Sequence, residues 1–197
     1  MPSYPEPSTK RVVTFFDCQN LFGIARKWWS YAYPNFNPIE LSKLVVRQNQ
    51  DWTLTGIRLY TGIHDFSKKP RLNQFWNRKL NAHKIKDPRV YVYTAPLLYT
   101  INGAKEKGID IRIALDLIRM ARLDQYDVAV LFSQDSDFKE VAKEIRDIAH
   151  ERQRWIKIAS ICLCHNSTDT VRGIDKTDWL KISKSDYDSC IDHANYY

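Results

Sequence analysis

Short apolar runs alternate with longer amphipathic segments along this chain. The apolar runs predict strands at residues 11–16, 55–63, 89–94, 127–133 and 156–163. Segments with apolar residues at helical spacing predict helices at residues 20–30, 38–50, 66–82, 108–123 and 135–151. A strand followed each time by a helix is typical of a parallel sheet covered on both faces. The sequence therefore predicts an α/β fold with a parallel central sheet of about five strands and helices on both faces.

The two ends of the chain differ from this pattern. Residues 1–10 contain three prolines and almost no apolar periodicity, so they are expected to form a flexible lead. Residues 178–182 predict a short closing element, and residues 186–197 a polar tail. No repeat or long linker divides the rest, so residues 11–185 are expected to form one domain. Neither a secretory signal nor an apolar run of ~20 residues is evident, and we expect a cytoplasmic protein without membrane contact.

Acidic residues stand where predicted strands end. Asp17 follows the first apolar run directly, and Asp135 and Asp137 follow the run Val128–Phe132. Asp110 lies in the first turn of the helix predicted at 108–123, where the helix dipole favours a carboxylate. Open α/β sheets bind ligands at the carboxyl ends of their strands. These acids are therefore expected to share one site, where a cation would offset their mutual repulsion.

Three motifs carry a family resemblance. They read FxDxxN from Phe15 to Asn20, KGxDxxxAxDL from Lys107 to Leu117, and SxDSDF from Ser133 to Phe138. In this order, on strand, helix and strand, they resemble the NYN domain in its bacterial LabA-like branch, within the PIN-like nuclease group. The resemblance covers roughly residues 11–185 and implies a Rossmann-like PIN/NYN fold. The chain departs from the family pattern at Gln134, where glycine is common, which puts the geometry of that loop in doubt.

The resemblance also implies a metal-dependent endoribonuclease. Its expected metal ligands are Asp17, Asp110, Asp135 and Asp137, and Asn20 joins them as a catalytic residue. Oxygen ligands of this kind suit Mg²⁺ or Mn²⁺, and such an ion activates water for attack on a phosphodiester. Two of these residues have structural alternatives, because Asn20 and Asp137 could instead cap the helices that follow them.

Two further residues are peripheral candidates for the site. Ser133 could donate a hydrogen bond to phosphate, although a hydroxyl beside a helix start usually satisfies backbone groups. The family pattern has an acid at Asp116, but at helical spacing this residue can pair with Arg112 or Arg119 instead.

The charge of the chain favours a polyanionic partner. Its 30 Lys and Arg exceed its 23 Asp and Glu, which gives a formal net charge of +7. The basic residues gather among aromatic ones, as expected for binding of phosphates and unpaired bases. The residues expected to bind RNA are Lys68, Lys69, Arg71, Arg78, Lys79, Lys105 and Lys107. The alternative is an amphipathic helix with a solvated basic face.

The expected function is metal-dependent hydrolysis of single-stranded or structured RNA. A non-catalytic RNA-binding or regulatory protein with the same fold is the alternative. RNA is the expected partner, and a homodimer or a regulatory protein partner stays open. The four cysteines show no zinc-binding spacing and are expected to be reduced thiols in the core.

Overall fold

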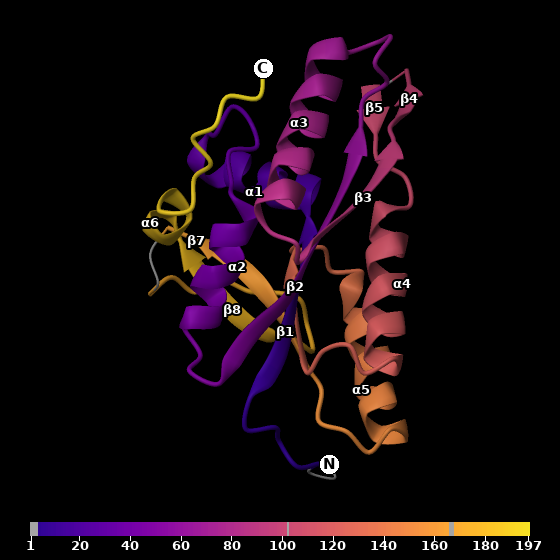
Figure 1. Cartoon of the computed structure of the whole chain (residues 1–197), viewed down its shortest axis with the longest axis vertical. Coiled ribbons are helices and arrows are strands. Elements are labelled where there is room, and N and C mark those ends of the chain that lie inside the picture. The colour runs from indigo at the N-terminus through magenta and orange to yellow at the C-terminus, as the bar shows by residue number, and fades with distance from the viewer. Residues whose placement is uncertain (1–3, 102, 166–167) are drawn as a thin grey trace.

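A computed structural model describes residues 4–101, 103–165 and 168–197 of the chain, so the first three residues of the expected lead lie outside the described residues. Its main sheet contains six strands, which are β1 (Lys10–Asp17), β2 (Trp52–Ile63), β3 (Val90–Pro96), β6 (Val128–Phe132), β7 (Lys157–Cys164) and β8 (Asp178–Ser183). All neighbouring strands pair in parallel, in the order β3-β2-β1-β6-β7-β8 (Figure 1). The prediction of a parallel sheet is confirmed, but β8 adds a sixth strand where only a closing element was expected.

Helices cover both faces of this sheet, as the sequence predicted. They are α1 (Cys18–Trp29), α2 (Pro38–Arg47), α3 (Pro70–Lys86), α4 (Ile109–Arg122), α5 (Phe138–Glu151) and the short α6 (Lys184–Asp188). Alternate residues of β1 point to opposite faces, as the period of a strand requires. Val12 and Phe16 join the core beneath α1, α2 and α3, whereas Val13 and Phe15 join the core beneath α4 and α5. All four cysteines are free and buried.

The strand order creates a reversal point between β1 and β6. The chain builds outward from β1 through β2 to β3, then returns and builds β6, β7 and β8 on the other side of β1. The two central strands run in parallel, with Phe16 beside Phe132 near their carboxyl ends. Helices that leave adjacent strands toward opposite faces open a crevice at such a point, which is where doubly wound sheets bind ligands. Residues that follow β1 and β6 therefore line a crevice.

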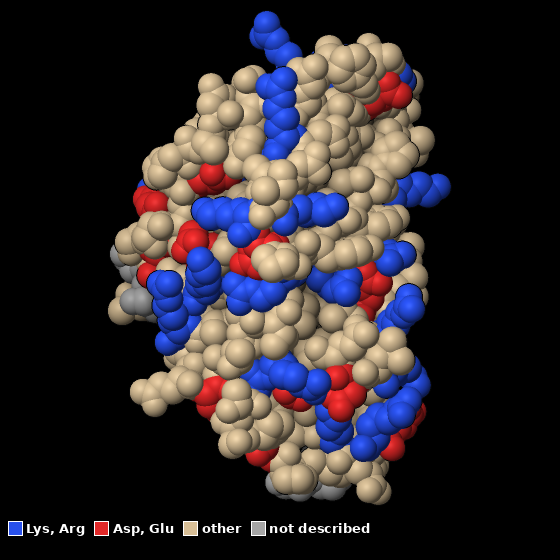
Figure 2. Space-filling view, viewed as in Figure 1, with Lys and Arg blue, Asp and Glu red and all other residues tan. Residues whose placement is uncertain are grey.

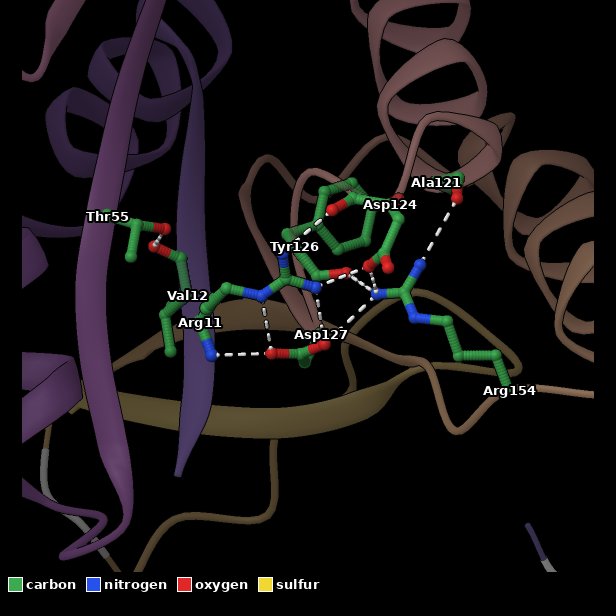
Figure 3. A network of polar contacts seen from close by, with 8 residues as sticks. All are labelled: Arg11, Val12, Thr55, Ala121, Asp124, Tyr126, Asp127 and Arg154. Atoms are coloured by element: carbon green, nitrogen blue, oxygen red, sulfur yellow. Dashed lines mark hydrogen bonds and ion pairs between the residues drawn. The ribbon is translucent and has the colours of Figure 1, made fainter. Parts of the chain in front are cut away.

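At the amino ends of the same strands, charges are paired (Figure 3). Asp127, which is 5% exposed, accepts hydrogen bonds from Arg11 Nη2 at 2.9 Å and from Arg154 Nη2 at 3.0 Å. Burial disfavours the ionised carboxylate, but the hydrogen bonds from the two arginines outweigh this cost and lower the pKa of Asp127 to about 2. Because Arg11 lies in β1 and Arg154 precedes β7, this cluster ties together the start of the sheet.

Two short strands and the chain's end complete the fold. The strands β4 (Leu98–Thr100) and β5 (Gly103–Lys105) form a separate antiparallel hairpin between β3 and α4, which the sequence did not predict. The segment after α6 returns to α3, where Tyr196 and Tyr197 contact Phe75. In the described part of the chain, no helix combines the length and apolar character that crossing a membrane requires.

Candidate active site

Asp17 ends β1 and caps the helix that follows it. Its Oδ1 accepts a hydrogen bond from the backbone N–H of Asn20 at 3.1 Å, so Asp17 rather than Asn20 is the N-cap of α1. The side chain of Asn20 is thereby available for another role. Its Oδ1 accepts from the backbone N–H of Gln134 at 3.0 Å, which fastens the loop after β6 to α1. The alternative assignment of Asn20 as the cap of the first helix is therefore wrong.

The loop after β6 is held by its own side chains. The hydroxyl of Ser133 lies 3.5 Å from Asp17 Oδ2 and accepts from the backbone N–H of Asp135 at 3.2 Å. Asp135 Oδ1 accepts from the backbone N–H of Asp137 at 3.0 Å. Asp137 stands at the N-cap position of α5 without a side-chain capping bond, and its side chain is exposed. Ser133 therefore acts as a buried link between the two central strand ends.

A third carboxylate joins from the segment that precedes α4. Glu106 Oε1 accepts a hydrogen bond from the backbone N–H of Gly62 in β2. A Cβ on Gly62 would stand 2.8 Å from Glu106 Cγ and would also meet Leu97, so with any larger residue these side chains would have to shift. Four residues later, Asp110 occupies the first turn of α4 with its side chain exposed. The sequence motifs had marked Asp110 but not Glu106.

These groups surround a cleft of about 530 Å³ at the carboxyl ends of the strands. Its lining residues are Asp17, Gln19, Asn20, His64, Leu97, Ala104, Lys105, Glu106, Ile109, Asp110 and Asp135. Four of the expected site residues, Asp17, Asn20, Asp110 and Asp135, thus line the same cleft. Asp137 lines a smaller neighbouring hollow that it shares with Asp110.

Burial and mutual repulsion raise the pKa values of two acids in the cleft. Burial, reinforced by the charges of Asp135 and Asp110, raises the pKa of Asp17 to about 6. Burial also raises the pKa of Glu106 to about 7, and the charges of Asp17 and Asp110 contribute. Hydrogen bonds from backbone N–H groups oppose both shifts without cancelling them. A cation in the cleft would relieve this repulsion.

The side chain of Asp116 is bound by other residues outside the cleft. It is buried and accepts hydrogen bonds from Tyr60 Oη at 2.8 Å and from Arg112 Nε at 3.2 Å. Arg112 was one of the two pairing partners expected from helical spacing. The hydroxyl and guanidinium satisfy this carboxylate, so Asp116 supports the sheet beneath α4 and does not line the cleft.

The predicted RNA-binding residues fall into three groups. Lys105 lines the cleft, and Lys107 is exposed just beyond it. Four others are exposed and lie just before α3 or along it; they are Lys68, Lys69, Arg71 and Arg78. Lys79 is different, since it is 2% exposed and its Nζ lies 2.6 Å from Asp192. The assignment of Lys79 to an RNA-binding surface was therefore wrong. Figure 2 shows basic side chains across the face that carries α3, with acidic ones scattered among them.

His64 lines the cleft although no sequence motif had marked it. It follows β2 directly, so the rule that located Asp17 and Asp135 at strand ends could have found it. Its Nδ1 lies 3.0 Å from the hydroxyl of Tyr99 in the β4–β5 hairpin. Lys68 Nζ stands 4.0 Å from the centre of the Tyr99 ring, which links the hairpin to the start of α3. Burial, and to a lesser degree Lys69, lowers the pKa of His64.

The donor set fits a hard divalent cation that keeps several of its waters. Within the described ranges, no three His, Cys, Asp or Glu side chains are gathered in an arrangement that could hold a metal ion alone. Mg²⁺ rarely needs such a cage, because one or two carboxylates, waters and substrate phosphates commonly hold it. Asp17 and Asp135, fixed by hydrogen bonds on adjacent strand ends, supply two oxygen donors, and Asp110 and Glu106 stand in the same cleft.

Comparison with known proteins agrees with the fold and the motifs. A crystal structure of a protein of unknown function, VPA0982 from Vibrio parahaemolyticus, superimposes with a TM-score of 0.59 over 93% of this chain and 98% of that chain. Its sequence identity of 19% supports a shared fold alone. No curated protein matches the chain significantly in sequence. The family model of the NYN domain matches residues 11–153, which hold all three motifs and every acid of the cleft. The chain therefore belongs to the NYN domain family.

Proposed function

We propose that this protein is a metal-dependent endoribonuclease that hydrolyses phosphodiester bonds of single-stranded or structured RNA. NYN domains are in general nuclease-like RNA-binding domains. The observation that carries the proposal is the convergence of Asp17, Asp110, Asp135 and Glu106 on one open cleft. The motifs further favour the LabA-like branch of the family.

Asp17 and Asp135 are the residues that would hold Mg²⁺ or Mn²⁺, and Asp110 would contact the ion directly or through a water. Asp17 and Asp135 are positioned by hydrogen bonds from the backbone N–H groups of Asn20 and Asp137. The bound cation would lower the pKa of a water and offset negative charge that develops on the phosphate. Asn20 maintains the geometry, because it ties the loop that carries Asp135 to α1.

Glu106 is suited to proton transfer in this cleft. Burial, which is the main cause of its raised pKa, strengthens the affinity of this carboxylate for a proton, as a general base requires. It would take a proton from the water that attacks phosphorus. The bond from phosphorus to the 3′ oxygen would break, and solvent water would protonate the departing oxygen. Lys105, exposed at the rim, would attract the phosphate backbone. The products would carry 5′-phosphate and 3′-hydroxyl ends.

A non-catalytic RNA-binding protein is the second candidate. The basic surface around α3 would serve either function, but the cleft itself discriminates between them. Carboxylates in a cleft repel phosphates unless a cation intervenes, so binding alone gains nothing from them. A homodimer or a regulatory partner is compatible with both candidates.

A cleavage assay tests the proposal. Mixed RNA is incubated with Mn²⁺, Mg²⁺ or EDTA, and Asp135→Asn serves as the matched variant because Asn preserves the size of the side chain. The proposal predicts cutting with either ion, and none with EDTA or with the variant. Tight RNA binding without cutting under any of these conditions would favour the non-catalytic candidate.

A further inference from the structure

A second cavity lies on α3 outside the cleft. It has a volume of about 540 Å³ and is lined by Arg71, Gln74, Arg78 and Tyr197. The three α3 residues are spaced three and four apart, so they share one face of the helix over two turns. Two guanidinium groups, one amide and one aromatic ring therefore surround a single hollow. These are the groups that proteins use for phosphates and unpaired bases.

The ring of Tyr197 is placed to stack with a planar ligand. One face lies on Phe75, with ring centroids 4.9 Å apart and ring planes inclined by 30°. Phe75 is 3% exposed, whereas Tyr197 remains 59% exposed. The buried ring thus provides a fixed base beneath Tyr197, and the outer face of Tyr197 is open to solvent. An aromatic ring with one supported and one free face is a stacking platform.

A buried charge cluster holds this segment against α3. Asp192 Oδ2 lies 2.6 Å from Lys79 Nζ and 3.3 Å from His83 Nε2, and it accepts a hydrogen bond from Tyr196 Oη at 3.0 Å. Lys79 and His83 are 2% and 3% exposed. Removing either partner of such a buried pair is costly, so the segment from Asp192 onward is firmly anchored. Lys79, too buried for direct RNA contact, therefore holds Asp192 and the start of this segment against α3.

We propose that this cavity is an RNA subsite that takes one unpaired nucleotide of a strand bound in the cleft. The base would stack on Tyr197, and Arg71 and Arg78 would bind the adjoining phosphates. Lys68 and Lys69 lie in the chain between the cleft residue His64 and the first turn of α3, so the segment that connects the two sites carries exposed basic side chains. Because a base inside a duplex is not available for stacking, the favoured substrate is single-stranded RNA. This inference rests on the proposed function for the identity of the strand.

Binding measurements in EDTA test the subsite independently of catalysis. Labelled unstructured RNA is titrated into the full-length Asp135→Asn protein, with Tyr197→Ala, Tyr197→Phe or the pair Arg71→Ala and Arg78→Ala added. Tyr197→Ala is expected to weaken binding about 5- to 150-fold, the usual range for one stacked base. Tyr197→Phe keeps the ring and should bind as tightly as the parent. The arginine pair should lower the salt dependence by about 1.4 units, or ~0.7 per phosphate contact on a single strand.

The matched control is the pair Lys84→Ala and Lys86→Ala. These residues are exposed on the last turn of the same helix, so the change in net charge is identical, but neither lines the cavity. If this pair weakens binding as much as the arginine pair does, attraction is general and the subsite is overturned. Unchanged RNA affinity in a folded Tyr197→Ala protein also overturns it. The subsite is overturned as well if duplex RNA binds as tightly as the single strand and Tyr197→Ala lowers both affinities by the same factor.

A small substrate separates this inference from the proposed function. Bis(p-nitrophenyl) phosphate is a phosphodiester without the further nucleotides of an RNA strand that would occupy the cavity at Tyr197. With Mn²⁺, the Tyr197→Ala protein with an intact Asp135 should hydrolyse it at the wild-type rate while cutting long RNA more weakly. If no phosphodiester is hydrolysed but RNA affinity still depends on Tyr197, the nuclease proposal fails and the subsite stands.

Discussion

At the scale of single residues, Asp17 lowers the stability of the folded protein while providing a ligand position in the cleft. Its carboxyl has a pKa of about 6 in the folded protein against 3.8 for an ordinary aspartate. The folded state therefore holds more protons than the unfolded state between pH 4 and 6, and stability falls as pH rises through this range. Above pH 6 the carboxylate of Asp17 is ionised, and its buried charge destabilises the folded state unless a cation binds.

Asp17→Asn is accordingly expected to stabilise the metal-free protein. The amide removes the buried charge yet keeps the oxygen that caps α1, since asparagine caps as well as aspartate. At pH 7.5 in EDTA, denaturant unfolding should show a gain of up to about 2–3 kcal/mol. Mn²⁺ should raise the midpoint of the wild type and leave the variant almost unchanged. A wild type that Mn²⁺ does not stabilise would contradict the assignment of Asp17 as a ligand.

The role of Glu106 as a proton acceptor can be tested by replacing one of its carboxylate oxygens with an amide nitrogen. Glu106→Gln keeps an oxygen for the N–H of Gly62 but cannot exchange a proton. RNA cleavage should fall by about 10²-fold or more, the usual contribution of a general acid or base. RNA affinity should be equal or higher, because one negative charge leaves the cleft. Cleavage at the wild-type rate would show that Glu106 only positions the segment before α4.

Sequence patterns found the residues whose place follows from secondary structure. Asp17 and Asp135 end buried strands, and that local fact was enough to put both at one edge. His64 directly follows a predicted strand and was overlooked, although the same rule covers it. Glu106 escaped because only tertiary packing against β2 brings it to the cleft. Lys79 was misassigned for the same reason, since its partner Asp192 lies 113 residues away.

At the scale of elements, the approach of the segment before α4 to β2 depends on one glycine. In Gly62→Ala, the new methyl group would stand 2.8 Å from Glu106 Cγ and would also meet Leu97. We expect overpacking to cost about 1–3 kcal/mol and to displace Glu106 from the cleft. Thermal unfolding and RNA cleavage measured together should therefore both decline.

Gly23→Ala is the matched control for this substitution. Gly23 lies on the exposed side of α1, and an added Cβ would meet no atom within 4 Å. Alanine should therefore stabilise the helix by up to about 1 kcal/mol. Cleavage by this variant should equal that of the wild type. Should Gly62→Ala also retain full stability and activity, the close contact with Glu106 would have no role in the cleft.

The elements that escaped prediction lack the usual signals. β4 and β5 have three residues each and are largely exposed, so neither shows periodicity. β8 has the mixed sequence DWLKIS, of which only the last two residues are buried, and the connection from β7 to β8 contains no helix among its described residues. Long buried runs such as Val128–Phe132 were predictable because burial on both faces leaves an unbroken apolar stretch.

At the scale of the whole molecule, the two ends of the sheet differ in charge balance. Arginines neutralise Asp127 at the amino ends of the strands, whereas the acids at the carboxyl ends crowd one another. Because the pKa of Asp127 is about 2 when folded, the unfolded state binds more protons between pH 4 and 2. Its contribution, roughly 2 kcal/mol, should be present above pH 4 and lost as pH falls toward 2.

Acid unfolding of Asp127→Asn measures this contribution. The variant should be less stable than the wild type at pH 7, and the difference should shrink between pH 4 and 2. The cleft should be unaffected, so Mn²⁺ should still raise its unfolding midpoint at pH 7. A difference in stability that does not change with pH would mean that packing, and not charge, accounts for the role of Asp127.

The chemistry of the product ends tests the central claim most directly. An unstructured RNA is cut with Mn²⁺, and the termini are identified by phosphatase and ligase treatment and by mass spectrometry. Water attack in the acidic cleft predicts 5′-phosphate and 3′-hydroxyl ends, with no cutting in EDTA or by Asp135→Asn. Attack by the ribose 2′-hydroxyl, the route that His64 would favour, would instead leave a cyclic phosphate. Cyclic ends, or equal cutting by Asp135→Asn in EDTA, would contradict hydrolysis by the carboxylate cleft.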